Sequence, residues 1–451
     1  MTAKEIKIRR GLDIPLKGQV PKADPVAYTS KLFAVQPTDF RMMKPRLMVK
    51  EGDAVQCGSP VVQNKLDERM LIVSPVSGTV KAVVRGAKRK LLRIEIESDG
   101  NQSCIDFGAI DPASAKKEQL VDIMLKAGIW PFIRQRPYGV IAKPEDTPRE
   151  IFITGFDSAP LAPNADLIVE GKQKEIQTAI NALKVFTEGK IHLSLHKDKN
   201  KSDLYAGLES VELHKFSGPH PSGNVGVQIH HIAPVNKGEV VWTLKLQDLI
   251  TIGTFLMTGK TDFTRRFVLA GSELTEGGYF EAIYGVQVIH LLKDKLVQDN
   301  VRVISGDVLT GDDAGKDGFL GFYHNMVSVI QQGDYYEFFG WAAPRFKKHS
   351  VSTAYFSRLM PNRKFKSDTN VHGGVRPFVM TGQYEKVFPF DIYPVQLLKS
   401  VLVEDIDLME QLGIYEVAEE DFALCEYVCT SKIDSQAIIR DGIDLMIKEL
   451  S

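Results

Sequence analysis

The segment from Gly253 to Thr261 is similar to a phosphate-binding loop, because it begins with glycine and ends in Gly-Lys-Thr. A phosphate-binding loop of this type needs four residues between its glycines, so that successive backbone N–H groups wrap the phosphate. Five residues separate Gly253 from Gly259, and the extra residue changes the path of the loop. No G-x-G-x-x-G follows a predicted strand, so dinucleotide binding through such a turn has no support either. A stand-alone nucleotide- or flavin-dependent enzyme is therefore disfavoured.

Residues 218–226 form a second glycine-rich segment, GPHPSGNVG, which follows a predicted strand. Because glycine has no Cβ, such a backbone could approach a ligand closely. A rigid turn without a ligand is an equally good interpretation.

The histidines do not show a metal-ligand pattern. The chain has no H-E-x-x-H motif, and no carboxylate lies at a convincing ligand spacing from His192 or His196. His230 and His231 fall in a stretch predicted to be a strand, where neighbouring rings face opposite sides. We therefore expect the histidines to be structural, and we expect neither metal ligands nor catalytic residues on this chain.

Cys425 and Cys429 lie four residues apart in DFALCEYVCTSK, which places both on one face of a predicted helix. A four-iron cluster needs four thiolates, typically at closer spacing. We therefore expect no iron–sulfur cluster on this chain.

Composition excludes several classes of protein. The net charge is -1, which argues against nucleic-acid binding. The N-terminus is charged rather than apolar, and no run reaches the roughly 18 to 20 apolar residues that span a bilayer. Four cysteines do not make a disulfide scaffold. These features predict a soluble cytoplasmic protein whose membrane contact is indirect, through a partner.

The order of hydrophobic patterns predicts several α/β and α+β domains. Short Val-rich runs and turns fill the first hundred residues and indicate compact β structure. The stretch KEQLVDIMLKAG at residues 117–128 then shows helical periodicity, with Gly128 as a stop. Alternating strands and helices follow, and Ile176, Ile180 and Leu183 should attach one helix to the sheet. A second small β unit begins near Thr264, and the chain ends in a helical tail.

Two stretches are strongly charged. Residues 81–93 contain six Lys and Arg and no acid, which fits either a soluble hairpin tip or a docking patch. Residues 404–421 hold eight acids and no Lys or Arg, which we interpret as a solvated face.

Several stretches together resemble one family over nearly the whole chain. They are IKIRRGLDIPLKG, SPVSGTV with RGAKRK, PFIRQRPYG at 131–139, GPHPSGNVG, HGGVRPF with YEKVFPFD, and EEDFALCEYVC. In this order they resemble the A subunit of the sodium-translocating NADH:quinone reductase. The resemblance implies a peripheral subunit on the cytoplasmic face of the bacterial inner membrane. It also implies five partner subunits, of which the membrane-embedded flavin-bearing one is the expected neighbour.

The resemblance also implies an architecture of four parts. These are a biotinyl/lipoyl-like β domain with an N-terminal extension, a Rossmann-like domain, a β-grasp domain of the soluble-ligand-binding type, and a mainly helical C-terminal domain. The expected boundaries are 1–112, 113–260, 261–330 and 331–451. Lys65 does not lie at the usual distance from Ser74-Pro75 for covalent attachment. We therefore expect no biotin, lipoate, flavin or iron–sulfur cluster here.

The function implied is quinone binding, with reduction of ubisemiquinone or ubiquinone to ubiquinol coupled to sodium export. Ubiquinone or menaquinone would be bound non-covalently, in an apolar cleft with a few polar donors. The seven candidate residues are Phe33, Phe40, Trp130, Phe132, Arg134, Arg136 and Tyr138. The alternative is that these aromatics pack between domains and the arginines form surface ion pairs. In that case the chain is a structural adaptor without a quinone site.

Overall fold

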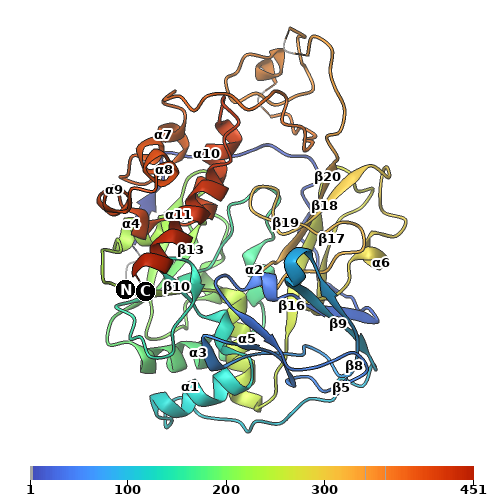
Figure 1. Cartoon of the computed structure of the whole chain (residues 1–451), viewed down its shortest axis with the longest axis vertical. Helices are drawn as coiled ribbons and strands as arrows, with labels where there is room; N and C mark the ends of the chain where they lie inside the picture. Colours follow the sequence, from blue (N-terminus) through green and yellow to red (C-terminus); the bar gives the residue numbers. More distant parts are fainter. Residues whose placement is uncertain (1–3, 341, 361, 451) are drawn as a thin grey trace.

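The computed structural model describes residues 4–340, 342–360 and 362–450. Four sheets and a helical tail make up this part of the chain (Figure 1). Sheets are therefore mixed with helices, as the sequence predicted. No helix among the described residues is long and apolar enough to cross a membrane.

The largest sheet has seven strands in the order β1-β14-β13-β12-β15-β10-β11. The strands are β1 (Lys4–Lys7), β10 (Arg134–Arg136), β11 (Val140–Ile141), β12 (Ile151–Thr154), β13 (Ile191–His196), β14 (Glu212–Ser217) and β15 (Val241–Lys245). The five from β1 to β15 in this order are parallel, whereas β10 runs antiparallel to both neighbours. Every residue of β13 is buried, as expected of a parallel strand covered on both faces.

Helices cover both faces of this sheet. Ile151 and Ile153 of β12 share a core with α3 (Gln173–Phe186) and α5 (Leu246–Thr258). Phe152 points to the other face and packs on α4 (Val225–Ile232). The helix predicted within 117–128 is α1 (Lys117–Lys126), and Ile176, Ile180 and Leu183 are buried as predicted. The short helix α2 (Ala165–Val169) contacts α5.

The stretch with His230 and His231 is a helix, so the prediction of a strand there was wrong. Asn224 is extended and precedes α4, which then continues through both histidines. The run VGVQIHHI is short and largely apolar, and periodicity alone cannot distinguish a helix from a strand at this length. The two rings consequently lie 5.2 Å apart, centroid to centroid, rather than on opposite sides of a sheet.

Two small antiparallel sheets follow the N-terminal segment. One contains β3 (Leu32–Val35), β5 (Ala54–Val55), β8 (Gly78–Arg85) and β9 (Leu91–Ser98), and the other β4 (Pro45–Leu47), β6 (Pro60–Asn64) and β7 (Asp67–Val73). The basic stretch 81–93 is the β8–β9 hairpin, whose tip contains the 3-10 turn Ala87–Arg89. Lys65 is exposed at the turn between β6 and β7. The predicted β structure of the first hundred residues is therefore confirmed.

The six-stranded sheet has the order β19-β18-β20-β16-β17-β2. Its strands are β2 (Val26–Ala27), β16 (Thr264–Ala270), β17 (Gly278–Ile283), β18 (Val301–Ser305), β19 (Asp312–Asp313) and β20 (Met326–Gln331). Helix α6 (Ile289–Leu292) lies between β17 and β18, as the predicted strand–strand–helix–strand order requires. Residues of this sheet share one core cluster with the seven-stranded sheet and the N-terminal β structure.

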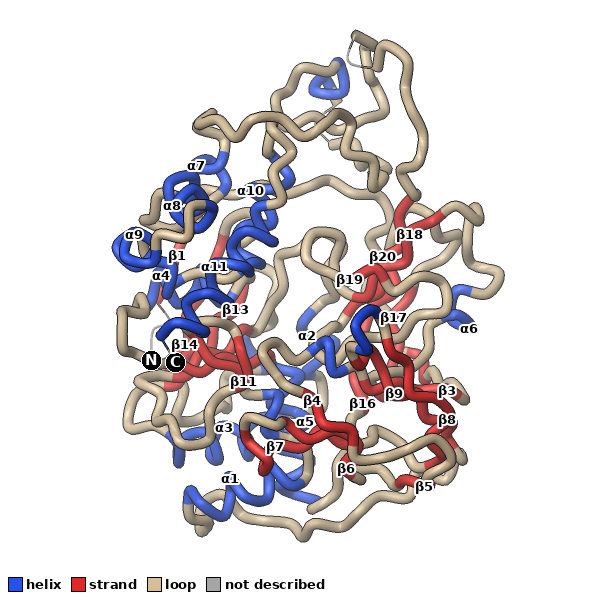
Figure 2. The backbone as a smooth tube through the Cα atoms, in the orientation of Figure 1, coloured by secondary structure: helices blue, strands red, loops and turns tan. Residues whose placement is uncertain are grey.

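The C-terminal region starts with a mostly irregular segment, which stands away from the sheets at the top of Figures 1 and 2. Within it, Phe356–Leu359 form a 3-10 turn. The tail helices are α7 (Tyr384–Val387), α8 (Pro394–Leu402), α9 (Ile406–Gln411), α10 (Ala423–Val428) and α11 (Ser435–Leu450). Cys425 lies in α10 and Cys429 follows it directly, and both are buried. The tail packs on N-terminal residues such as Ile8 and Ile14, so the two ends of the chain share a core.

Candidate functional site

A cavity of about 110 Å³ lies at the carboxyl ends of β12 and β15. From β12 the chain proceeds to β13 on one side, and it later returns through α4 to β15 on the other side. In parallel α/β sheets, this reversal of strand order leaves a crevice where ligands commonly bind. The residues after the two strands, Gly155 to Asp157 and Leu246 to Gln247, line the cavity. The sheet topology therefore accounts for the position of the site.

The glycine-rich segment 218–226 forms another wall of the cavity. His220, Gly223, Asn224 and Val225 all line it. A Cβ added to Gly223 would lie only 2.5 Å from the backbone nitrogen of Ser158. Glycine is thus needed here because the loop packs against the protein's own backbone. The segment is both tightly packed and adjacent to the cavity, so the two interpretations of its sequence are compatible.

His220 presents an unsatisfied polar atom at the cavity. Its Nδ1 lies 3.0 Å from Ser158 Oγ, and its backbone N–H donates to Asp13 at 2.9 Å. Its Nε2 is buried and has no hydrogen-bond partner among the described residues. Burial lowers the pKa of His220, and the nearby carboxylates of Asp307 and Asp157 oppose that effect. The ring is therefore expected to be neutral, with Nε2 available to a ligand.

Three cationic side chains line the cavity, but they are not equivalent. Arg265 lies 2.6 Å from Asp248 and is buried, so its charge is already compensated. Lys245 Nζ donates to the carbonyl of Tyr323 at 3.3 Å. Arg134 lies over the Tyr323 ring at 4.9 Å, and its guanidinium has no ion pair or hydrogen bond within the described part of the chain. Arg134 is therefore the cation most available to an electron-rich ligand.

Glu420, which belongs to the C-terminal tail, lines one side of the cavity. Arg136 lies 2.6 Å from Glu420 and 3.5 Å from Asp421, and its side chain is buried. Asn224 Nδ2 also donates to the backbone carbonyl of Glu420 at 3.3 Å. The charge of Arg136 lowers the pKa of Glu420, whereas burial raises the pKa of Asp421 to about 7. The guanidinium favours the ionised form of both carboxylates, but at Asp421 burial and the charge of Glu420 outweigh it.

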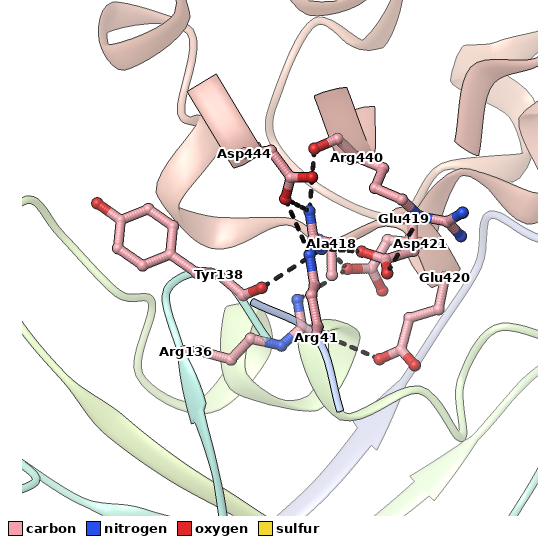
Figure 3. Close-up of polar contacts among 9 residues, drawn as sticks. All are labelled: Arg41, Arg136, Tyr138, Ala418, Glu419, Glu420, Asp421, Arg440 and Asp444. Carbon is pink, nitrogen blue, oxygen red and sulfur yellow. Dashed lines mark hydrogen bonds and ion pairs between the residues drawn. The ribbon is translucent and has the colours of Figure 1, made fainter. Parts of the chain in front are cut away.

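Arg41 joins the N-terminal β structure to the same acidic segment (Figure 3). Its guanidinium lies 2.6 Å from Glu419 and 2.7 Å from Asp444, and it donates to the carbonyl of Arg440 at 2.9 Å. The interpretation of 404–421 as a solvated face was therefore wrong for Glu419, Glu420 and Asp421. These carboxylates neutralise arginines that are distant in sequence. The only sequence signal for them was the run of acids without a basic residue.

The structure places one of the seven predicted quinone residues, Arg134, at the cavity. Phe40 and Phe132 both pack on Phe322, at centroid distances of 4.8 and 4.5 Å. Phe33 and Trp130 are core residues, and the Trp130 indole donates to Ala142.

Tyr138 packs edge-on against Tyr415 of the tail. Arg136 does not line the cavity itself, but it forms an ion pair with Glu420, which does. Lys245 and Asn224 line the cavity and were not among the predicted residues. His220 lies in the segment that was recognised as glycine-rich, but it was not itself chosen.

Three family models match the chain in succession. They are described as the NqrA N-terminal barrel-sandwich hybrid domain at residues 6–99, the NqrA second alpha/beta domain at 115–261, and the NQRA C-terminal domain at 268–316. The cavity-lining residues of β12, β15 and the glycine-rich segment all fall within the second match.

Curated relatives match over almost the full length. The chain is 37% identical to the A subunit of the Na(+)-translocating NADH-quinone reductase from Rhodopirellula baltica, over 98% of both chains. It is 35% identical to the proteins of that name from Neisseria meningitidis serogroup B and Hahella chejuensis, over 98% of this chain and 100% of theirs. Among solved structures, an NAD+-reducing [NiFe]-hydrogenase in the air-oxidized state covers 75% of this chain and 61% of its own, at 12% identity and a TM-score of 0.36.

Proposed function

The chain belongs to the family of the A subunit of the Na(+)-translocating NADH-quinone reductase, as its motifs predicted, and we propose that it binds quinone in the cavity between β12 and β15. As part of this oxidoreductase, it would contribute to the reduction of ubisemiquinone or ubiquinone to ubiquinol, coupled to sodium export. It would sit on the cytoplasmic face of the bacterial inner membrane. Electrons would arrive from the membrane-embedded flavin-bearing subunit, one of five partners.

The observation that supports this proposal is that apolar and polar side chains line the same cavity. Phe156, Ile168 and Leu246 provide apolar walls suited to a quinone ring. Arg134, Lys245 and His220 provide polar atoms for its carbonyl oxygens. Added electrons place negative charge on those oxygens, and two nearby cations would stabilise that charge. The chain thereby binds and orients the quinone, while redox partners deliver the electrons.

We also propose the finer description of the fold. A mostly parallel sheet with helices on both faces and a crevice at its strand reversal supports a Rossmann-like domain over 113–260. The paired hairpins of the N-terminal sheets support a biotinyl/lipoyl-like domain over 1–112, and the six-stranded sheet supports a β-grasp domain over 261–330. The mainly helical domain would comprise 331–451. The predicted absence of covalent cofactors, flavin and iron–sulfur clusters stays a prediction.

A photoreactive ubiquinone analogue applied to the intact complex tests the proposal. Labelled peptides should include residues 154–157, 220–225 or 245–247 of this chain. Arg134→Met should reduce both the labelling and quinone-dependent turnover, while NADH oxidation by an artificial acceptor persists. Arg46→Met is the matched control, because Arg46 is exposed and is not among the residues that line the cavity. Labelling confined to other subunits would refute quinone binding here.

The second candidate function is a structural adaptor without a quinone site. It is favoured by the segment 333–382, whose described residues expose many large apolar side chains, including Tyr336, Phe338, Leu359 and Val375. The segment also contains eight Lys and Arg against three Asp and Glu. Exposed apolar surface of this extent marks sites of protein contact. We propose that it docks on the membrane-embedded partner protein.

Photo-crosslinking amino acids at positions 338 and 375 of the intact complex would test the docking surface. We expect crosslinks to another protein of the complex from both positions and none from position 66, where Leu66 is exposed on a different part of the chain. Crosslinks together with quinone labelling only elsewhere would establish the adaptor function in place of quinone binding. The absence of crosslinks from both positions would exclude this docking surface.

A further inference from the structure

A second group of polar residues lies at the amino ends of β13 and β14, away from the cavity. His192 of β13 pairs in register with Glu212 of β14, and Ser194 pairs with His214. Since side chains alternate along a strand, His192, Glu212 and His214 all point to the same face of the sheet. Phe152 of β12 lies on this face too, and its ring stacks on His192 at 4.7 Å.

The donor atoms of these residues converge. Nδ1 of His192 lies 3.0 Å from Nε2 of His214 and 3.8 Å from Oε2 of Glu212. One ligand atom from each residue lies within 4.8 Å of the other two. The 3.0 Å contact is a hydrogen bond between the rings. Two imidazole nitrogens bound tetrahedrally to one ion at about 2.0–2.1 Å lie roughly 3.3 Å apart, so a small shift of the rings would admit an ion. The spacing therefore suits a single ion between the three side chains.

We propose that His192, Glu212 and His214 form a binding site for a divalent transition-metal ion of the Zn²⁺ class. Two imidazoles and one carboxylate are a common ligand set for such ions, and they leave a fourth position for water. The sequence predicted structural histidines, and it did not single out Glu212, which lies two residues before His214 on β14. His192 comes from the neighbouring strand β13, so only the register brings it to Glu212 and His214.

The protonation of the cluster is compatible with an ion. Burial lowers the pKa of His192, and it lowers the pKa of His214 to about 4. Both rings are therefore neutral near pH 7. Because Nδ1 of His192 and Nε2 of His214 lie at hydrogen-bond distance, the ring that donates must move its proton to its other nitrogen when an ion binds. The charged groups that face the rings are Glu150, Glu212, Lys190 and Lys4. Their formal charges cancel, so the cations do not outweigh the carboxylates.

The surroundings also orient the ligands. Glu150 Oε1 lies 3.4 Å from Nε2 of His192, on the side of the ring opposite to the proposed ligand atom. A carboxylate in this position commonly fixes the ring of a metal-binding histidine. Lys190 Nζ forms an ion pair with Oε1 of Glu212 at 2.7 Å, so Oε2 remains on the side of His192. The site can thus bind an ion without breaking the exposed ion pair.

The proposal is independent of quinone binding, because the two sites lie at opposite ends of the strands. An ion here would link β13 to β14, which is the strand that β1 pairs with at the edge of the sheet. We therefore expect bound Zn²⁺ to raise the midpoint of thermal unfolding of the chain, as any ligand of the native state does.

The test uses the full chain without a polyhistidine tag, stripped with a chelator and titrated with Co²⁺ and Zn²⁺. We expect one ion per chain, with visible Co²⁺ absorption that Zn²⁺ removes. His214→Gln should abolish stoichiometric binding, and Glu212→Gln should weaken it at least tenfold. Glu150→Gln should weaken it roughly 10–100-fold, the usual range for such supporting carboxylates.

The control variant is His290→Gln, because His290 is exposed on α6. It should bind Co²⁺ like the unmodified chain. Glu212 has a 41% exposed side chain, so Glu212→Gln should fold even if a histidine variant does not. Absence of stoichiometric binding, or binding unchanged in both Glu212→Gln and His214→Gln, would overturn the proposal.

Discussion

The guanidinium of Arg136 lies 2.6 Å from Oε1 of Glu420, although 284 residues separate them in sequence. Arg136 belongs to β10 of the seven-stranded sheet, whereas Glu420 belongs to the C-terminal tail. Glu420 also lines the cavity, so this ion pair couples the position of the tail to the shape of the candidate site. Arg134, two residues earlier, reaches the cavity directly.

Replacing Arg136 by Met should strongly destabilise the protein. The side chain is only 4% exposed, and its loss would leave the fully buried Asp421 and the partly buried Glu420 without an ion-pair partner among the described residues. Breaking a buried ion pair from one side typically costs about 3–5 kcal/mol in the free energy of unfolding. Urea unfolding of the purified chain measures this loss. Arg46→Met, at an exposed pair, should change stability by less than about 0.5 kcal/mol.

In the assembled complex, Arg136→Met should also reduce quinone-dependent turnover, because Glu420 would no longer be held at the cavity. Adding Glu420→Gln and Asp421→Asn to Arg136→Met removes the unpaired carboxylates. The triple variant should therefore recover part of the free energy of unfolding that Arg136→Met loses. A loss below about 1 kcal/mol in the single variant would contradict the structural role of Arg136.

Gly226→Ala should destabilise the chain, although alanine is normally the better helix residue. Gly226 is the second residue of α4, and an added Cβ would lie 2.7 Å from Oδ2 of Asp421. Overpacking of this kind costs about 1–3 kcal/mol, which exceeds the roughly 0.5–1 kcal/mol that alanine provides in a helix. Thermal unfolding compares the variant with Gly207→Ala, whose Cβ would meet no atom of the described residues within 4 Å. Equal midpoints for the two variants would show that α4 and Asp421 can separate freely.

Asp39 should make stability depend on pH. Burial raises the pKa of Asp39 to about 7, while its Oδ2 accepts a hydrogen bond from the backbone N–H of Phe322. A carboxyl group whose pKa is raised in the folded state favours folding fully below its unfolded pKa of about 4. This contribution is lost as the pH rises through about 7.

Asp39→Asn retains the acceptor and removes the titration. We therefore compare the midpoint of thermal unfolding of the variant with that of the unmodified chain at each pH. The difference should shift in favour of the variant between pH 5 and pH 8.5. Differential scanning calorimetry at the two pH values measures the change, with the exposed Asp24→Asn as control. If the difference between Asp39→Asn and the unmodified chain is the same at both pH values, Asp39 does not titrate in this range.

Arg41→Gln should loosen the C-terminal helix from the rest of the molecule. Arg41 is 15% exposed and contacts both Asp444 of α11 and Glu419, so its loss removes two ion pairs between distant segments. Hydrogen exchange should become faster in α11 while exchange in β12 and β13 remains unchanged, because local opening needs fewer contacts to break than global unfolding. Unchanged exchange in α11 would show that apolar packing alone holds this helix.

Local patterns in the sequence determined the parts of the fold that depend on neighbouring residues. The helices at 117–126 and 173–186 and the β8–β9 hairpin were predictable, because each buries residues at the period of its own element. The family was also recognisable from a succession of short motifs. The helix containing His230 and His231 was not, since eight residues are too few for periodicity to decide.

Only the tertiary structure decided which charged residues meet. In the sequence, Glu419 to Asp421 look like part of a solvated acidic run. In the structure, the packing of the tail places them next to Arg41 and Arg136. The cavity itself depends on the order of β12 and β15 in the sheet, and the His192–Glu212–His214 cluster depends on the register of β13 with β14. Strand order and register arise from contacts between segments far apart in the chain, so no local pattern of residue types specifies them.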